Sequence, residues 1–238
     1  MMSARLLRFI VIIVSVLFIF PLSAVMAEGS GGKPAILIDP AHGGADKGVA
    51  LSKSVHEKAV TLAIAKEIKS YFSKTKTIKI YLTRSTDKDL SISERKRAAT
   101  KLHANLLVSL NINAGFGKEA SGYEVYFPGF GKTASAKGNS KEKIVSDMVR
   151  NEYLNNSVRF AHIVMKNIEK IFPRKNRGLR TAPIPILEGL TIPAVVIELG
   201  FATNIQDRKK LMNKKVQKSI AAAVGKSIKE YLATPGVQ

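Results

Sequence analysis

Short apolar runs along this chain alternate with segments whose apolar residues recur every three or four positions. The runs predict strands at 35–38, 78–83, 106–112, 123–127 and 194–199, and a further short strand at 185–187. The helical spacing predicts helices at 55–72, 91–104, 156–172, 206–212 and 216–232, and a short helix near 141–153. Apolar strands that alternate with helices are typical of a three-layer α/β domain.

The N-terminal 27 residues have the pattern of an export signal. Arg5 and Arg8 precede an apolar stretch at 9–20, which is shorter than the roughly 20 residues of a membrane-spanning helix. Val25 and Ala27 fit the small residues of a cleavage site, so we expect cleavage after Ala27, with an uncleaved N-terminal anchor as the alternative. In both cases the body of the protein is expected to be exported.

The remaining chain has the composition of one domain. It divides into a flexible leader at 28–34, a single domain at 35–233 and a tail at 234–238, without internal repeats. The sequence contains no cysteine, which excludes disulfides and thiolate metal sites. A bound metal would therefore need histidine or carboxylate ligands.

The net charge changes the picture of the expected partners. The chain carries 38 lysines and arginines against 18 acidic residues, a formal net charge of +20. Such a charge favours polyanions, and for an exported protein we expect anionic envelope polymers. Nucleic acid is not expected, because the aromatic residues are not interleaved with the basic ones. A solvated basic surface with no specific partner is the alternative.

Five polar residues stand at or near the ends of predicted strands. His42 follows the first strand, Asn111 and Asn113 end the third, Glu198 ends the last, and Glu57 opens the first helix. Binding sites in open α/β sheets form at the carboxyl ends of the strands. We therefore expect these side chains to share one cleft.

Each of these residues also has a purely structural interpretation. Ser54 and Glu57 have capping-box spacing, so Glu57 would then only stabilise its helix. Asn111 would satisfy backbone groups in a turn, and His42 would be an ordinary loop residue. Glu198 directly follows three apolar residues, where a carboxylate is costly unless it is paired with a cation.

Several ordered motifs resemble those of one known enzyme family. In order they are IDPAHGG, EKAVTLAIAKEI, IYLTRSTDKDLSISERKRAA, LLVSLNINA, GYEVYF, NRGLR and IPAVVIELGFATN. They resemble the zinc-dependent N-acetylmuramoyl-L-alanine amidases of bacterial cell walls, amidase type 3, over residues 35–232. The resemblance implies a mixed, mostly parallel central sheet flanked by helices, as in zinc exopeptidases. It also implies hydrolysis of the amide between N-acetylmuramic acid and L-alanine of peptidoglycan, in the periplasm or cell wall.

The resemblance also assigns expected roles to single residues. It implies that His42 and Glu57 are ligands of one zinc ion and that Glu198 is the catalytic glutamate. Asn111 stands where the family has a third ligand, a histidine, and Ala41 replaces a glycine of the first loop.

Two further residues, Asn113 and Arg177, are expected to bind substrate. The identity of the third metal ligand stays open among three possibilities. Asn111 binds the metal through its side-chain oxygen, His56 substitutes for it, or the site holds no metal and the protein binds peptidoglycan without cutting it.

The segment 128–152 suggests a hypothesis about regulation. In some relatives an inserted helix at this place covers the zinc until an activator protein moves it, and here the segment offers Glu142 and Glu152. A plain surface loop is the alternative.

Overall fold

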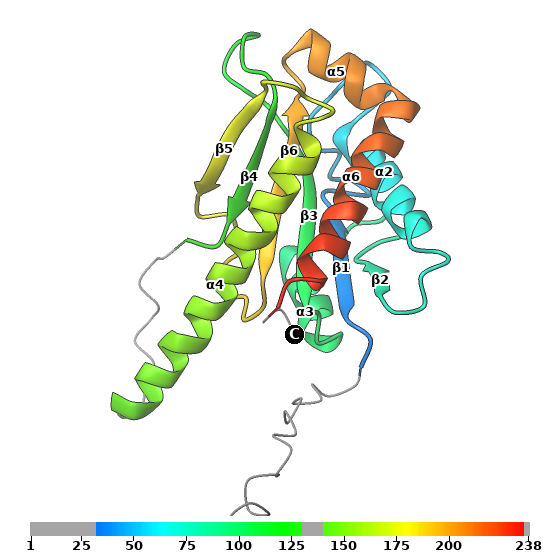
Figure 1. Ribbon diagram of the computed structural model, residues 1–238. Helices are drawn as coiled ribbons and strands as arrows, with labels where there is room; N and C mark the ends of the chain where they lie inside the picture. Colours follow the sequence, from blue (N-terminus) through cyan, green and yellow to red (C-terminus); the bar gives the residue numbers. More distant parts are fainter. Residues whose placement is uncertain (1–31, 130–139, 236–238) are drawn as a thin grey trace, which may run out of the picture. The chain divides into compact units, whose positions relative to one another are not determined.

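The computed structural model describes residues 32–129 and 140–235 of the chain (Figure 1). Within this part, one six-stranded sheet has the strand order β2-β1-β3-β6-β4-β5. The strands are β1 (Ala35–Pro40), β2 (Lys79–Leu82), β3 (Leu106–Asn113), β4 (Tyr123–Phe127), β5 (Asn176–Thr181) and β6 (Ala194–Phe201). Strands β1, β2, β3 and β6 are parallel to one another. Strand β4 pairs antiparallel with β6, and β5 pairs parallel with β4. The mixed, mostly parallel sheet is confirmed.

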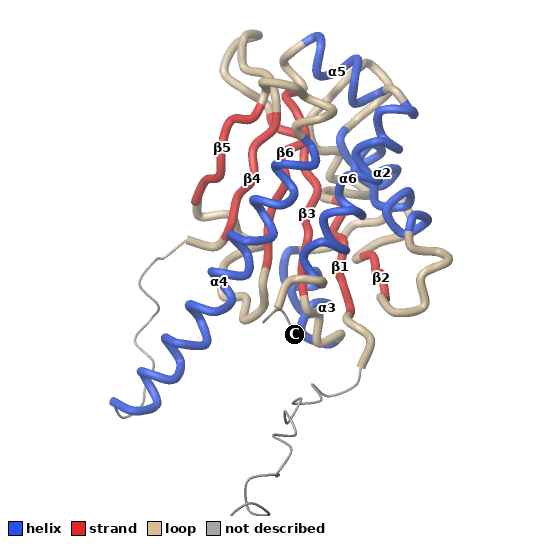
Figure 2. The backbone as a smooth tube through the Cα atoms, in the orientation of Figure 1, coloured by secondary structure: helices blue, strands red, loops and turns tan. Residues whose placement is uncertain are grey.

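Helices cover both faces of the sheet. They are α2 (Glu57–Tyr71), α3 (Ile92–Lys101), α4 (Ser140–Ile168), α5 (Ile205–Met212) and α6 (Lys214–Leu232). Helices α2, α4 and α6 lie on one face and α3 on the other, while α5 lies at the carboxyl end of β6 (Figure 2). The predicted three-layer arrangement is therefore confirmed.

The two faces of the sheet bury different amounts of apolar surface. Ile36, Val108 and Ile197 belong to the large core under α2, α4 and α6. Their neighbours Leu37 and Val196 belong to the small core under α3. Because strand side chains alternate between faces, Asp39 and Glu198, two positions beyond these neighbours, also lie on the α3 face. That face carries the polar side chains at the carboxyl edge of the parallel strands.

The structure corrects three of the predicted elements. The predicted strand at 185–187 is part of a turn, and the strand β5 was not predicted. The sequence NRGLRT of β5 lacks an apolar run because the strand is at the edge of the sheet and half exposed. The predicted helices at 141–153 and 156–172 form one helix, α4, because no glycine or proline interrupts residues 140–168.

Several expectations concern residues outside the described part. The signal peptide expected at 1–27 and most of the leader belong to residues 1–31, which the structure does not describe. Most of the tail is likewise outside the described residues. Among the described helices, none is long and apolar enough to cross a membrane.

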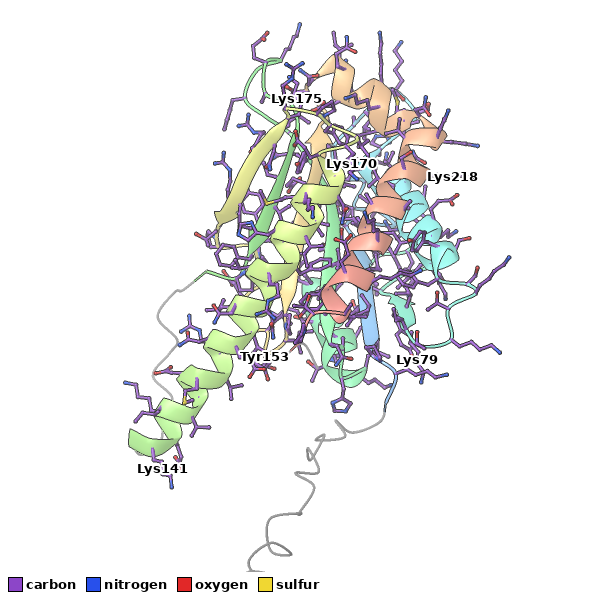
Figure 3. All side chains as sticks on the ribbon, in the orientation of Figure 1. Lys79, Lys141, Tyr153, Lys170, Lys175 and Lys218 are labelled. Carbon is purple, nitrogen blue, oxygen red and sulfur yellow. The ribbon has the colours of Figure 1, made fainter. Side chains whose placement is uncertain are left out.

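The described part of the segment 128–152 lies at the amino end of β6, away from the predicted site. Val149 and Tyr153 of α4 line a cavity of about 970 Å³ together with Leu187 and Ile192. Figure 3 shows Lys141 and Tyr153 on the half of α4 that extends away from Lys170 and Lys175. Residues 140–152 therefore do not cover the carboxyl edge of the sheet, and residues 130–139 lie outside the described part.

Two arginines hold the loop that follows β1. Arg84 is 1% exposed and donates from Nε to the carbonyl of Pro40 (3.0 Å) and from Nη2 to those of Ala41 (2.9 Å) and Lys58 (2.8 Å). Arg95, also buried, donates to Asp39 (2.7 Å) and to the carbonyls of Pro40 and His42 (both 3.0 Å). These bonds satisfy backbone groups that have no place in the sheet.

We predict that Arg84→Met lowers the free energy of unfolding by at least about 3 kcal/mol, because each buried acceptor left unsatisfied costs about 1–3 kcal/mol. Urea denaturation followed by circular dichroism measures this. Arg97→Met is the control, since Arg97 is exposed on α3, and its effect should stay within about 0.5 kcal/mol. Equal effects of the two substitutions would contradict the role given to Arg84.

Candidate active site

His42 is held in an unusual backbone conformation at the end of β1. Its φ is +61°, in the left-handed region, and Gly43 and Gly44 follow with positive φ. A side chain at Gly43 would collide with the carbonyl of Lys88, so the tight turn requires glycine there. The turn directs the His42 ring toward the start of α2, where its Nε2 atom meets Glu57.

Glu57 is a buried carboxylate fixed by two backbone amides. Its side chain is 2% exposed; Oε1 accepts from the amide of Ile112 (2.7 Å) and Oε2 from that of Val49 (3.1 Å). The N-cap of α2 is His56, so the capping box given as the structural alternative for Ser54 and Glu57 does not form. Glu57 instead joins the ends of three segments, and its Oε2 atom faces the histidine.

The central contact of the site joins His42 Nε2 and Glu57 Oε2 at 3.2 Å. His42 Nδ1 lies 2.7 Å from the carboxylate of Asp46, which favours a proton on Nδ1. In the neutral ring Nε2 is then an acceptor that faces a second acceptor, so a proton or a cation must lie between them. Accordingly, the hydrogen bond to Glu57 raises the pKa of His42 to about 9, against the lowering effect of burial.

The same distance fits two ligands of one zinc ion. Zinc binds imidazole nitrogen and carboxylate oxygen at about 2.0–2.2 Å, so two tetrahedral ligands lie about 3.4 Å apart. The carboxylate of Asp46 behind the ring is the partner that a ligating histidine usually has. The residues present therefore fit a zinc ion at this position, with His42 and Glu57 as two of its ligands.

Asn111 is the third available donor. Among the described residues, no group of three or more His, Cys, Asp or Glu side chains has the arrangement of a metal site, so His56 does not complete the ligand set. The amide nitrogen of Asn111 donates to Ser109 Oγ (3.1 Å), which in turn donates to Asp39 (2.8 Å). These hydrogen bonds use the amide nitrogen of Asn111. The Oδ1 atom of the same amide is left as the atom that would bind a cation.

Glu198 lies beside Asn111 on the same face of the sheet. The two residues are register partners in β3 and β6, and Glu124 of β4 is the partner of Glu198 on its other side. Atom Oε2 of Glu198 is buried without a hydrogen-bond partner among the described residues. Burial, followed by the charges of Glu57 and Glu124, raises the pKa of Glu198 to about 8, while His42 lowers it. An unpartnered carboxylate of this kind is typical of a functional site.

The two residues expected to bind substrate lie at different places. Asn113 is the last residue of β3, where its carbonyl accepts from the amide of Ala202 (2.8 Å). Arg177 lies on the edge strand β5, with Nε 2.6 Å from Glu124 and the guanidinium 5.0 Å from the centre of the Phe201 ring. Their roles in binding remain predictions.

Four residues that shape the site are not among the residues expected from the sequence. Asp46, Arg84, Arg95 and Glu124 each contact a loop or side chain described above. Glu124 had a usable signal, because it is a charged residue inside the apolar strand YEVYF. Arg84 and Arg95 lie in the motif IYLTRSTDKDLSISERKRAA, but only the folded loop shows that they and Asp46 hold the His42 loop.

The chain matches the model of one protein family over residues 36–230, described as N-acetylmuramoyl-L-alanine amidase. The amidase AmiC of Escherichia coli O6:H1 is 28% identical over 83% of this chain, which spans 52% of the AmiC length. The amidase CwlM of Bacillus licheniformis is 29% identical over 78% of the chain and 64% of CwlM. The chain thus spans only part of these curated relatives.

Solved structures of similar proteins have the same fold. An N-acetylmuramoyl-L-alanine amidase from Clostridium difficile 630 aligns with a TM-score of 0.71 and 29% identity, over 85% of this chain and 98% of that one. AmiC2 of Nostoc punctiforme aligns with a TM-score of 0.70 and 26% identity, over 86% and 99%. Clostridioides difficile CwlD, solved with the GerS lipoprotein, shares the fold (TM-score 0.69, 24% identity, 84% and 98%).

The family match covers most of the chain, and the described residues form the fold that solved amidase structures share. The chain belongs to the N-acetylmuramoyl-L-alanine amidase family.

Proposed function

We propose that this protein hydrolyses the amide bond between N-acetylmuramic acid and L-alanine in peptidoglycan with the help of a zinc ion. The family and its named relatives support the reaction. The observation that carries the proposal is the 3.2 Å approach of His42 Nε2 to Glu57 Oε2. Two fixed acceptor atoms beside the unpartnered carboxylate of Glu198 suit a cation-assisted hydrolysis.

His42, Glu57 and Asn111 would hold the zinc ion. When bound, zinc polarises a carbonyl and lowers the pKa of water toward ~7. His42 and Glu57 are preorganised by bonds to Asp46 and to backbone amides. Asn111 offers a neutral amide oxygen, a weaker zinc ligand than imidazole. We therefore expect lower zinc affinity than a site with three charged or imidazole ligands would have.

Glu198 is the proposed general base and acid. Burial holds its pKa near 8 without a metal, and a nearby cation would lower it, so that the carboxylate is available around neutral pH. It would take a proton from the attacking water and deliver it to the leaving amine of L-alanine. Arg177 and Asn113 would bind the stem peptide on either side of Glu198.

The proposed substrate also indicates where the protein acts. Peptidoglycan lies outside the cytoplasmic membrane, and the N-terminal apolar segment with its basic residues supports export to the periplasm or cell wall. The high positive charge supports contact with anionic envelope polymers. An activator protein is a further proposed partner; CwlD was solved in complex with a lipoprotein.

We predict that Glu198→Gln lowers the release of stem peptides from purified sacculi by at least about 100-fold, because it removes the proton acceptor. Bound zinc, measured by elemental analysis, should stay near one ion per chain. The control is Glu188→Gln, since Glu188 is exposed at the other end of β6. A wild-type protein that neither binds zinc nor releases peptide would contradict the proposal and indicate a wall-binding protein without activity.

We predict that Asn111→His raises zinc affinity at least about tenfold, because an imidazole replaces a neutral amide oxygen. Competition with a fluorescent chelator measures the affinity, and sacculus digestion measures the activity, which should rise when zinc is limiting. If zinc affinity falls instead, Asn111 belongs to a site built around the amide.

The site also predicts a dependence of stability on pH. Without metal, the folded pKa values of His42 (about 9 against 6.5) and Glu198 (about 8 against 4.5) are both raised. Proton binding therefore stabilises the folded form at low pH, and that stability is lost as pH rises to 9. Zinc needs the deprotonated histidine. The melting temperature of the zinc-free protein should fall between pH 6.5 and 9. Over the same range the increase in melting temperature caused by zinc should grow.

Thermal denaturation with and without a chelator measures both trends. In His42→Ala the zinc-dependent increase should disappear, whereas His162→Ala, an exposed position on α4, should keep it. A zinc effect that shrinks as pH rises would contradict the competition between proton and metal.

A further inference from the structure

A second charged cluster lies beside Glu198, on the outer strands of the sheet. Glu124 of β4, with a side chain 4% exposed, is the register partner of Glu198. Its Oε1 atom lies 2.6 Å from Arg177 Nε and 3.7 Å from Arg180 Nε, and its Oε2 accepts from the hydroxyl of Tyr126 (2.7 Å). Both carboxylate oxygens are therefore used.

These contacts fix the two arginines but leave some of their guanidinium donors without a partner among the described residues. Their side chains are 38% and 47% exposed. Arg177 stacks over Phe201, and Arg180 Nη2 donates to the carbonyl of Arg177 (3.2 Å). Within the described residues, neither Nη atom of Arg177 has a hydrogen-bond partner, and the same holds for Nη1 of Arg180. These donors belong to side chains that are held in place and partly exposed.

The charges of the cluster do not cancel. Within this cluster, without Glu198, one carboxylate stands against two guanidinium groups, so an excess of one positive charge remains on the β5 side. Neutralising Glu124 requires only one arginine. Paired guanidinium donors with a surplus charge are suited to bind a carboxylate, because the planar donor groups match its two oxygens.

We infer that Arg177 and Arg180, positioned by Glu124, form a subsite for a free carboxylate on the second residue of the stem peptide. The inference rests on the proposed function. Strand β5 is two strand spacings, roughly 10 Å, from β6, and the Arg177 side chain reaches back from β5 to Glu124, the register partner of Glu198. The second residue of an extended peptide is about 7 Å from the bond being cut, and a carboxylate on its side reaches further.

The ligand is therefore the α-carboxylate of a γ-linked D-glutamate. A stem peptide in which this carboxylate is a primary amide would keep its size and lose its charge. The subsite thus distinguishes the acid from the amide form of one substrate, and the catalytic glutamate and metal ligands do not contribute to that distinction.

The test compares two muramyl peptides that differ only in this group, D-glutamate or D-isoglutamine at the second residue. We expect the full-length zinc-loaded protein to have a kcat/KM about tenfold or more higher for the acid, mainly through KM. Arg180→Met should remove most of this preference. Lys209→Met, which deletes an exposed charge on α5, should keep it, and a loss there would mean general attraction only.

Binding gives a readout that does not depend on turnover. Calorimetry with the product peptides L-alanyl-γ-D-glutamate and L-alanyl-γ-D-isoglutamine should show the same preference in wild type and its loss in Arg180→Met. Equal kcat/KM and equal binding for acid and amide would overturn the inference while leaving the proposed function intact. Hydrolysis of neither substrate would instead count against the proposed function.

Discussion

The site depends on one contact, the approach of an imidazole nitrogen to a carboxylate oxygen at 3.2 Å between His42 and Glu57. Both atoms are acceptors when the ring is neutral and bonded to Asp46, so the arrangement is stable only with a positive charge between them. The fold fixes both partners independently. Arginines hold the loop of His42, and backbone amides hold Glu57. The folded protein thus maintains a position that attracts a cation.

The sheet arranges the remaining groups in a row on one face. Asn111, Glu198 and Glu124 occupy matching positions on the adjacent strands β3, β6 and β4. The antiparallel strand β4 places a second buried carboxylate, Glu124, next to Glu198. Strand β5, which pairs with β4, places Arg177 beside that carboxylate. The change of strand direction therefore joins the proposed hydrolytic centre to a surface that recognises charge.

The apolar pattern was sufficient to predict the parallel strands and the helices that cover them, because both follow from burial. It failed at β5, whose polar residues lie at an edge, and at 185–187, where an apolar run forms a turn. The structure brings His42 to Glu57 and places Glu198 beside Asn111, close enough for the charges of His42 and Glu57 to act on its pKa. The roles of Asp46, Arg84 and Arg95 were not predictable, since Asp46 contacts the His42 ring and the two arginines bind backbone carbonyls that only folding brings near.

The central claim is that a metal ion binds between His42 and Glu57. Anomalous diffraction from crystals grown with zinc, recorded on both sides of the zinc absorption edge, tests it most directly. The account predicts a peak about 2.0–2.2 Å from His42 Nε2 and from Glu57 Oε2, with Asn111 Oδ1 as a third ligand. A structure without a peak at this position, in which a hydrogen bond joins the two side chains despite saturating zinc, would contradict it.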